Sequence, residues 1–361
     1  MHGSGEPCMV RLICVIFIII TFNFCDAYAE NIPQIEGEPY FNQTAEELAK
    51  GSFFINPADI IKDVLSILFD EIIRSKEILM AMLMIGVASA LASLIHTSFE
   101  SKSVGGIAFY GCFCIMCASA VECFSVSLRY AKEVIGIMHT FVTKFTPVIS
   151  TALLLSGKVA SASVFHPFLS TGAYAVSFIT EKWIIPLITY HAVLSVVNNM
   201  STDVRISGVC KLINGTTKWI LAASFTLFSG LCGIYGFGAP AIDVMGAKTM
   251  KFAVGSLVPV VGGFLSDTLD TVISGGALMK SAVGGAGIAS ICVMCAVPII
   301  KISVIIFMMK ITAAIAEPIT DKRISQLLWD ISSSVTMLFA MVVTMAVLFI
   351  VCISIIAAST R

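Results

Sequence analysis

Apolar runs of about 20 residues recur along most of this chain, and they constrain its fold more than any other feature. A run of that length crosses the hydrocarbon core of a bilayer as an α-helix. Charged residues make up only 12% of the sequence, whereas a typical soluble domain has about 25%. We therefore predict an all-α polytopic membrane protein with about ten hydrophobic segments after a signal peptide.

The N-terminal part of the chain divides into a leader and a short polar segment. Residues 1–29 have the pattern of a secretory signal peptide, with an A-x-A cleavage site at Ala27-Tyr28-Ala29. The alternative is an uncleaved first membrane anchor. Residues 30–76 are predicted to form a short extracytoplasmic segment with an amphipathic helix that begins near Asn56-Pro57. The multi-pass membrane domain would then occupy residues 77–361.

The membrane domain contains a weak internal repeat, with four apolar segments in each copy. The copies cover about 134–238 and 246–356, and a constant shift places Pro147 on Pro259 and Pro186 on Pro298. The motif D-x-R-I-S follows in both copies as a linker before a hydrophobic run. Counting segments places both linkers and Lys158 on the cytoplasmic side. The charged linker residues are Asp203, Arg205, Asp321 and Arg323.

Residues 258–276 lack the sequence pattern of an uninterrupted membrane helix, because they contain two carboxylates, a proline and two glycine pairs. Charge and broken backbone persist at membrane depth only where protein or water covers them. We expect a re-entrant or half-length helix whose carboxylates reach water or pair with a lysine. The candidate path or partner-binding residues are Asp267, Asp270, Lys280, Lys301 and Lys144. The candidate helix-break and packing residues are Pro147, Pro186, Pro259, Pro298, Gly262, Gly263, Gly275 and Gly276.

Two interpretations of the broken segments remain open. Segments interrupted by Gly or Pro at matching places in two halves indicate the binding site of a transporter. The alternative is tilted or half-length helices that pack through small residues, with Asp267 and Asp270 capping a helix or facing water at the membrane interface.

Several function classes lack support in the sequence. It has no H-E-x-x-H, G-x-S-x-G, P-loop or G-x-G-x-x-G motif, so we predict no enzyme activity and no catalytic residues. The C-x-x-C pairs lie in apolar runs without a flanking histidine, which favours buried thiols over a metal or cofactor site. The net charge of −1 and the lack of a polybasic run predict no nucleic-acid partner. The predicted partners are the lipid bilayer and other proteins.

Three motifs resemble those of the stage III sporulation protein AE family. They are F-H-P at residues 165–167, V-P-V-V-G followed by S-D-T-x-D-T-V-I-S up to Ser274, and C-A-x-P-x-I-K ending at Lys301. The resemblance implies a multi-pass protein of the mother-cell membrane that surrounds the forespore. It also implies an assembly with the sister proteins AA to AH, and indirect contact with the forespore protein Q across the intermembrane space.

The resemblance favours a non-enzymatic membrane subunit of a channel-like or secretion-like complex that supports the forespore after engulfment. Two alternatives stay open. In the first alternative the protein is a structural membrane scaffold with no conduction path, and in the second it is a free-standing secondary transporter.

Overall fold

A computed structural model describes residues 102–200, 206–257, 262–318 and 320–358, together with the single residues Ile73, Met80 and Met84. Every element in the described ranges is helical, which confirms the all-α prediction there. The predicted signal peptide, extracytoplasmic segment and first apolar segment (about 78–98) lie outside the described ranges. The elements are α4 (Lys102–Leu155), α5 (Val159–Ile179), the π-helix η1 (Thr180–Ile184), α6 (Ile185–Met200), α7 (Ser207–Leu257), α8 (Gly262–Ala316) and α9 (Lys322–Ala358).

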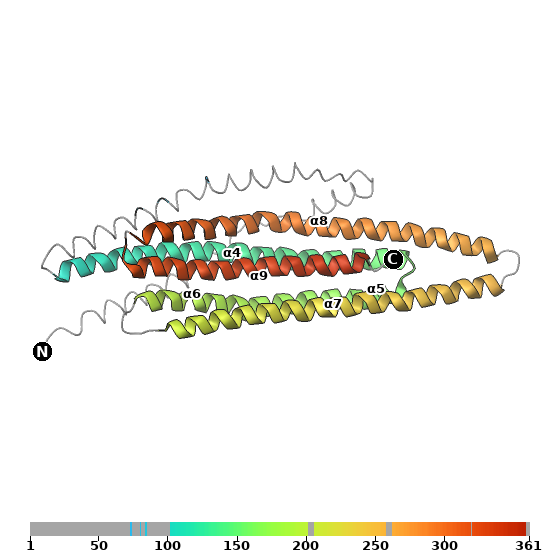
Figure 1. The fold of residues 1–361 in the computed structure, drawn as a ribbon. Helices are drawn as coiled ribbons and strands as arrows, with labels where there is room; N and C mark the ends of the chain where they lie inside the picture. The colour runs from blue at the N-terminus through green and yellow to red at the C-terminus, as the bar shows by residue number, and fades with distance from the viewer. Residues whose placement is uncertain are drawn as a thin grey trace.

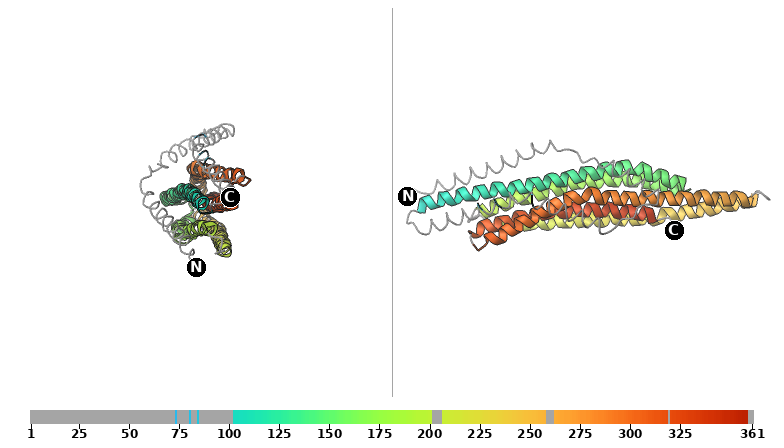
Figure 2. Two further views of the ribbon diagram at one scale, coloured as in Figure 1. Left: turned by 90° about the vertical axis from the view of Figure 1, so that its left-hand side faces the viewer. Right: turned by 90° about the horizontal axis from the view of Figure 1, so that it is seen from above.

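The helices form one elongated bundle and run roughly along a common axis (Figures 1 and 2). Helix α9 packs against α4, α6, α7 and α8, and α4 also packs against α5 and α8. The end of α6, the start of α7 and the α8–α9 turn share one end of the bundle, which we call the linker end (Figure 1). The turn between α4 and α5 lies toward the other end, which we call the Gly157 end.

Five helical stretches in the described ranges are long and apolar enough to cross a membrane, and they contain 34 to 43 residues each. At 1.5 Å per residue these stretches are about 50–65 Å long, roughly twice the hydrocarbon thickness of a bilayer. The predicted segments are therefore joined in pairs. Segments 104–128 and 134–156 both lie in α4, and segments 159–180 and 183–199 form the row α5–η1–α6.

Charged joints explain why these two pairs of predicted segments form two continuous helical rows in the described ranges instead of four separate helices. The joint in α4 contains Arg129, Lys132 and Glu133, and the joint at η1 contains Glu181 and Lys182. These charged residues interrupt the run of apolar residues, but Lys, Arg and Glu are good helix formers. Neither joint contains the glycine or proline needed to end a helix, so the backbone continues.

The glycine pairs do not interrupt the backbone of α8. This helix begins at Gly262-Gly263 and continues through Gly275-Gly276 to Ala316, so the expected half-length helix is not observed. A glycine costs a helix about 1 kcal/mol relative to alanine. An unbonded peptide group in hydrocarbon costs several kcal/mol, so continuing the helix is favoured.

The prolines are also accommodated within helical segments. Pro147 lies inside α4 and Pro298 lies inside α8. Pro186 is the second residue of α6, and α6 begins directly after the π-helix. Pro259 lies outside the described ranges, so the superposition of the two repeat copies stays a prediction.

The turn between α4 and α5 is fixed by backbone geometry at Gly157. This residue has φ 73°, a left-handed conformation that glycine adopts without a steric penalty. The Gly157 N–H donates to Leu154 O at 3.0 Å, and the Lys158 N–H donates to Leu153 O at 3.0 Å. This pair of bonds is a Schellman motif, which ends α4 and returns the chain as α5.

The two D-x-R-I-S motifs lie at the starts of α7 and α9, both at the linker end (Figure 1): Ser207 is the first residue of α7, and Lys322 is the first residue of α9. Asp321 caps α9, because its Oδ1 atom accepts the Arg323 N–H at 2.9 Å. Helix α7 begins at Ser207, and Asn198 Oδ1 accepts the preceding Ile206 N–H at 3.1 Å. Asp203 and Arg205 lie outside the described ranges.

One topological expectation is corrected. Lys158 lies at the Gly157 end, whereas Lys322 and Arg323 lie at the opposite, linker end. These residues cannot all face the cytoplasm if the bundle crosses one membrane. The segment count assumed a turn between residues 128 and 134, whereas α4 continues through this charged joint.

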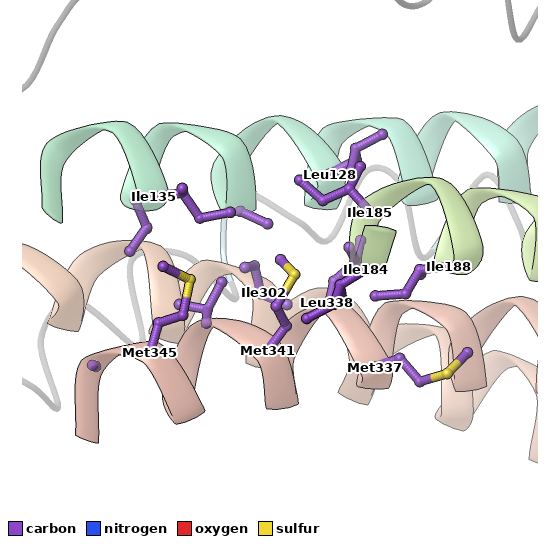
Figure 3. Close-up of a cluster of buried hydrophobic side chains, with 14 of the residues drawn as sticks. Leu128, Ile135, Ile184, Ile185, Ile188, Ile302, Met337, Leu338, Met341 and Met345 are labelled. Atoms are coloured by element: carbon purple, nitrogen blue, oxygen red, sulfur yellow. The ribbon is translucent and has the colours of Figure 1, made fainter. Parts of the chain in front are cut away.

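The core of the bundle is apolar. Buried side chains from five elements point toward one another in the core (Figure 3). They include Ile135 of α4, Ile184 of η1, Ile188 of α6, Ile302 of α8 and Leu338 of α9. Small residues let helices approach closely. A Cβ atom added at Gly287 of α8 would lie 2.7 Å from the Phe145 ring of α4.

Candidate functional site

A cluster of buried and half-buried polar side chains interrupts the apolar core where α6, α7 and α9 meet. Each helix contributes residues spaced four apart, which places them on one face of that helix. We call the cluster the polar junction, and it comprises His191, Ser195 and Asn199 of α6, Cys210 and Asn214 of α7, and Asp330 and Ser334 of α9.

The histidine of the polar junction has a defined orientation. His191 is only 5% exposed, and its Nδ1 atom lies 2.8 Å from Ser334 Oγ. The Ser334 hydroxyl donates to the Asp330 carbonyl oxygen at 3.2 Å. The contact between His191 Nδ1 and Ser334 Oγ links α6 to α9, and the tautomer of the ring sets which of the two atoms donates.

The carboxylate of Asp330 connects α9 to α6. Its Oδ2 atom accepts a hydrogen bond from Asn199 Nδ2 at 2.7 Å, and Oδ1 accepts one from Gln326 Nε2 at 3.2 Å. Asn199 Nδ2 also donates to the Ser195 carbonyl oxygen at 2.8 Å. Asp330 lies within electrostatic range of both His191 and Cys210.

One acceptor of the polar junction is not satisfied by the protein. Asn214 Oδ1 is buried and has no hydrogen-bond partner, whereas Ser195 lies within hydrogen-bonding reach of the Cys210 thiol. An unsatisfied buried polar group costs about 1–3 kcal/mol. Proteins commonly satisfy such groups with ordered water. The polar junction thus combines an imidazole, a carboxylate and an amide oxygen to which a water molecule can donate.

Ionisable residues inside a membrane bundle are costly, and they often mark proton or ion pathways. The polar junction has this character, and it also fixes α6, α7 and α9 relative to one another. Within the described ranges, no group of three or more His, Cys, Asp or Glu residues could hold a metal ion.

A second polar contact joins α7 to the start of α5. Asp243 Oδ1 accepts the Ala160 N–H at 2.8 Å, and Oδ2 accepts the Ser161 N–H at 2.9 Å as well as the Ser161 hydroxyl. Helix α5 has no local side-chain cap. Asp243 therefore caps α5 from another helix, where a carboxylate also complements the helix dipole.

The predicted site residue Lys301 lies at the charged joint of α4. Its Nζ atom is 4.9 Å from the centre of the Tyr130 ring, a cation–π contact. It is also within electrostatic range of Glu133. Lys301 thus joins α8 to α4 near the middle of the bundle.

The structure does not bring Lys301 near the predicted carboxylates. Asp270 and Lys301 lie 31 positions apart in the same continuous helix, which separates them by about 46 Å. Asp267, Asp270 and Lys280 all lie in the first part of α8, and their side chains are outside the described set. Lys280 is about 15 Å along the helix axis from Asp270, too far for a direct ion pair. Lys144 is exposed on α4.

Sequence reasoning missed the polar junction and Asp243. The spacing H-x3-S-x3-N at 191–199, C-x3-N at 210–214 and D-x3-S at 330–334 would have placed polar residues on one face of each helix. That these three faces meet depends on tertiary packing, which the spacing does not specify. Asp243 was detectable as an isolated carboxylate in the apolar part of α7.

The comparisons with known proteins agree with the motif resemblance. The sequence model for stage III sporulation protein AE matches residues 40–360. Stage III sporulation protein AE of Bacillus subtilis (strain 168) is 28% identical over 310 residues, which cover 86% of this chain and 78% of that protein. No solved structure matches the chain. Since the family match covers most of the sequence, this chain belongs to the stage III sporulation protein AE family.

Proposed function

We propose that the protein is a non-enzymatic integral membrane subunit of a sporulation channel or secretion-like complex that links the mother cell and the forespore. The single observation that supports this most strongly is the family match over residues 40–360. Within the part of the chain that the structure describes, five helices have the length and composition of membrane spans, which is consistent with such a subunit. In this proposal the protein is required for forespore development after engulfment.

The proposed location is the mother-cell membrane around the forespore. The proposed partners are the sister proteins AA to AH and, indirectly, the forespore protein Q. This partner set follows from the family resemblance. The polar junction supports a role for the bundle beyond anchoring, because a purely apolar core would hold the helices together without the half-buried Asp330.

The proposed orientation places the linker end in the cytoplasm. Cations at this end include Lys211, Lys310 and the pair Lys322–Arg323, whereas those toward the Gly157 end include Lys158, Lys248 and Lys251. Cytoplasmic ends of membrane proteins are enriched in Lys and Arg. A membrane-impermeant maleimide applied from the outer side should label Leu155→Cys, at an exposed position of the Gly157 end, and not Glu317→Cys. The reverse labelling would contradict this orientation.

Purification with partner identification tests the proposed function. A tagged protein is extracted in mild detergent from sporulating cells, and co-purifying proteins are identified by mass spectrometry. We expect the sister proteins to be recovered, and we expect none of them in an equal preparation with an unrelated tagged membrane protein. Recovery as a stable monomer without these proteins would contradict the proposal and favour the free-standing transporter.

A further inference from the structure

Two exposed lysine–tryptophan pairs lie near the middle of the bundle. The sequence K-W-I occurs at residues 182–184 of η1 and again at residues 218–220 of α7. Trp183 is 60% exposed and Trp219 is 72% exposed, and the lysine before each of them is exposed as well. The chain has three tryptophans, so two of them occupy this arrangement. Exposed tryptophan and lysine side chains of this kind are typical of the headgroup layer of a membrane.

Contacts between helices place the two pairs at one level along the bundle. Helices α5 and α7 lie side by side (Figures 1 and 2). The Phe228 ring of α7 stacks on Phe168 of α5 with the ring centres 5.6 Å apart. Nearer the linker end, Cys210 of α7 is within electrostatic range of Asp330, which bonds Asn199 of α6. Each tryptophan lies about midway between these two contacts on its own helical row. We call their shared position the tryptophan level.

Charged residues of α4 and α8 lie at the tryptophan level too. Helices α4 and α5 run in opposite directions from the Gly157 turn, and Ser177 Oγ lies 3.3 Å from His139 Nδ1. Counting along both helices from this contact places residues 129–133 opposite residues 183–187. Lys301 of α8 contacts a ring in this part of α4. Cations outnumber carboxylates among the described residues at this level, with Arg129, Lys132, Lys182, Lys218 and Lys301 against Glu133 and Glu181.

A second charged level lies about one bilayer thickness away, toward the Gly157 end. Asp243 of α7 caps α5 there, and Lys158 is within electrostatic range of it. Residues 159–180 of α5 and residues 219–242 of α7 contain no Asp, Glu, Lys or Arg. Lys158 and Lys182 are 24 positions apart, which corresponds to about 36 Å of helix. A bilayer is about 30 Å thick in its hydrocarbon core and about 40–45 Å with its headgroups, so both charged levels would reach headgroups.

The outward face of α7 between the two levels suits contact with lipid. Its exposed large side chains are Leu227, Leu231, Ile234, Tyr235 and Ile242. The other exposed residues that the structure describes there are alanines, glycines and Thr226, whose hydroxyl donates to the Ala222 carbonyl oxygen at 2.9 Å. Helix α4 carries Lys144 in the same layer, so only the α7 side is assigned to lipid.

The bundle continues beyond the tryptophan level toward the linker end, where it carries the polar junction. Asn199 is 16 positions beyond Trp183 in the row η1–α6, and it bonds Asp330 of α9. The exposed Trp329 precedes Asp330, so it lies roughly 20 Å from the tryptophan level. An ionisable group in hydrocarbon costs several kcal/mol, and a position outside the bilayer removes that cost.

We propose that the two lysine–tryptophan pairs bind the headgroup layer of an anionic phospholipid membrane. The bilayer then covers the bundle from the tryptophan level to Asp243, with α7 facing lipid. The linker end, including the polar junction, projects from the membrane into water. Amphipathic indole rings are favoured at headgroup depth, and each lysine near an anionic membrane surface contributes about 1 kcal/mol. The alternative is a bilayer that covers the linker end instead.

Tryptophan fluorescence tests the depth of each level. The full chain is reconstituted in vesicles of phosphatidylcholine and phosphatidylglycerol. Three variants each keep one native tryptophan and have phenylalanine at the other two positions. A fourth variant carries Leu227→Trp and phenylalanine at all three native positions, which places its indole about 12 Å deeper than Trp219. Lipids with a nitroxide near the headgroup or near the chain end quench an indole according to its depth.

The expected quenching differs between the variants. Trp183 and Trp219 should be quenched about twofold or more strongly by the headgroup label than by the chain-end label. The Leu227→Trp variant should show the reverse preference. Trp329 should be quenched about fivefold less than the Leu227→Trp variant by either lipid, because it lies outside the bilayer.

The role of the lysines is tested with the nitroxide on only one lipid class. In vesicles of constant composition, labelled phosphatidylglycerol should quench Trp219 about two- to fivefold more strongly than labelled phosphatidylcholine. Lys182→Gln combined with Lys218→Gln should lower this ratio by about twofold or more. The control Lys322→Gln changes a lysine at the linker end and should leave the ratio unchanged.

Each part of the proposal has an outcome that overturns it. Chain-end quenching of Trp329 as strong as that of the Leu227→Trp variant would place the bilayer on the linker end. Equal quenching of Trp183 and Trp219 by the two labels would remove the headgroup assignment. An unchanged ratio in the double lysine variant would remove the role of the lysines. These vesicles contain no sister proteins, so failure of this inference is distinguishable from failure of the proposed function.

Discussion

Replacing Asp243 by alanine should detach α7 from the first turn of α5. The carboxylate accepts hydrogen bonds from the Ala160 and Ser161 amides and from the Ser161 hydroxyl. Hydrogen bonds to a charged group contribute about 1.5–3 kcal/mol each. The two amides are at a helix N-terminus, where water recovers part of this energy. We therefore expect the free energy of unfolding to fall by about 2–4 kcal/mol.

Two further variants make the measurement specific. Asp243→Asn keeps one acceptor oxygen and loses the charge. Its free energy of unfolding should therefore fall about half as far as that of Asp243→Ala, by roughly 1–2 kcal/mol. Glu181→Ala removes an exposed carboxylate and should change the free energy by less than about 0.5 kcal/mol. Unfolding is followed by titrating SDS into mixed micelles, and hydrogen exchange reports the Ala160 and Ser161 amides. If Asp243→Ala unfolds like Glu181→Ala and both amides stay protected, the capping argument is refuted.

The same variant predicts a change in the pH dependence of stability. Burial lowers the pKa of Lys158 below its ordinary value of 10.5, and Asp243 partly opposes this shift. Between the folded and unfolded pKa values the unfolded chain binds more protons, so stability rises with pH in that window. Removing Asp243 should lower the pKa of Lys158 in the folded protein further. The rise of stability with pH should therefore begin at a lower pH and be larger. An identical pH profile in wild type and Asp243→Ala would contradict this coupling.

Three further substitutions test the packing, the polar junction and the predicted carboxylates. Gly287→Ala should lower the free energy of unfolding by about 1–3 kcal/mol in the same assay, because the added methyl group meets an aromatic ring. The control Gly230→Ala adds a methyl group in open space and should not destabilise the protein. Asp330→Ala should lower the free energy of unfolding by about 2–3 kcal/mol, and a loss no larger than that of Gly230→Ala would contradict the role given to its carboxylate. The double variant Asp267→Asn with Asp270→Asn should block sporulation after engulfment while the protein still accumulates in the membrane. A normal spore yield would rule out that role.

The structure sharpens the test of the predicted carboxylates. A capping residue precedes the first turn of a helix. Because α8 begins at Gly262, Asp267 and Asp270 lie inside the helix, beyond the capping position. The rival explanation, in which asparagine would cap nearly as well, therefore no longer applies to these two residues.

The sequence predicted the class of the fold because apolar runs and low charge reflect the solvent around the helices. At the second D-x-R-I-S motif, Asp321 lies directly before α9, which begins at Lys322 and contains the rest of the motif. The sequence did not predict the polar junction. Spacing identifies the polar face of α6, but the choice of α7 and α9 as neighbours depends on long-range packing.

The paired segments show why hydropathy and helix continuity are separate properties. At the α4 joint, Arg129, Lys132 and Glu133 end an apolar run, but each side chain leaves the backbone hydrogen bonds intact. At Gly157 the neighbouring run ends without a comparable cluster of charges, yet the helix stops, because the left-handed conformation redirects the chain. Charge marks where a helix leaves an apolar environment, and backbone conformation marks where the helix ends. A sequence that contains both therefore needs separate criteria to count its spans and its helices.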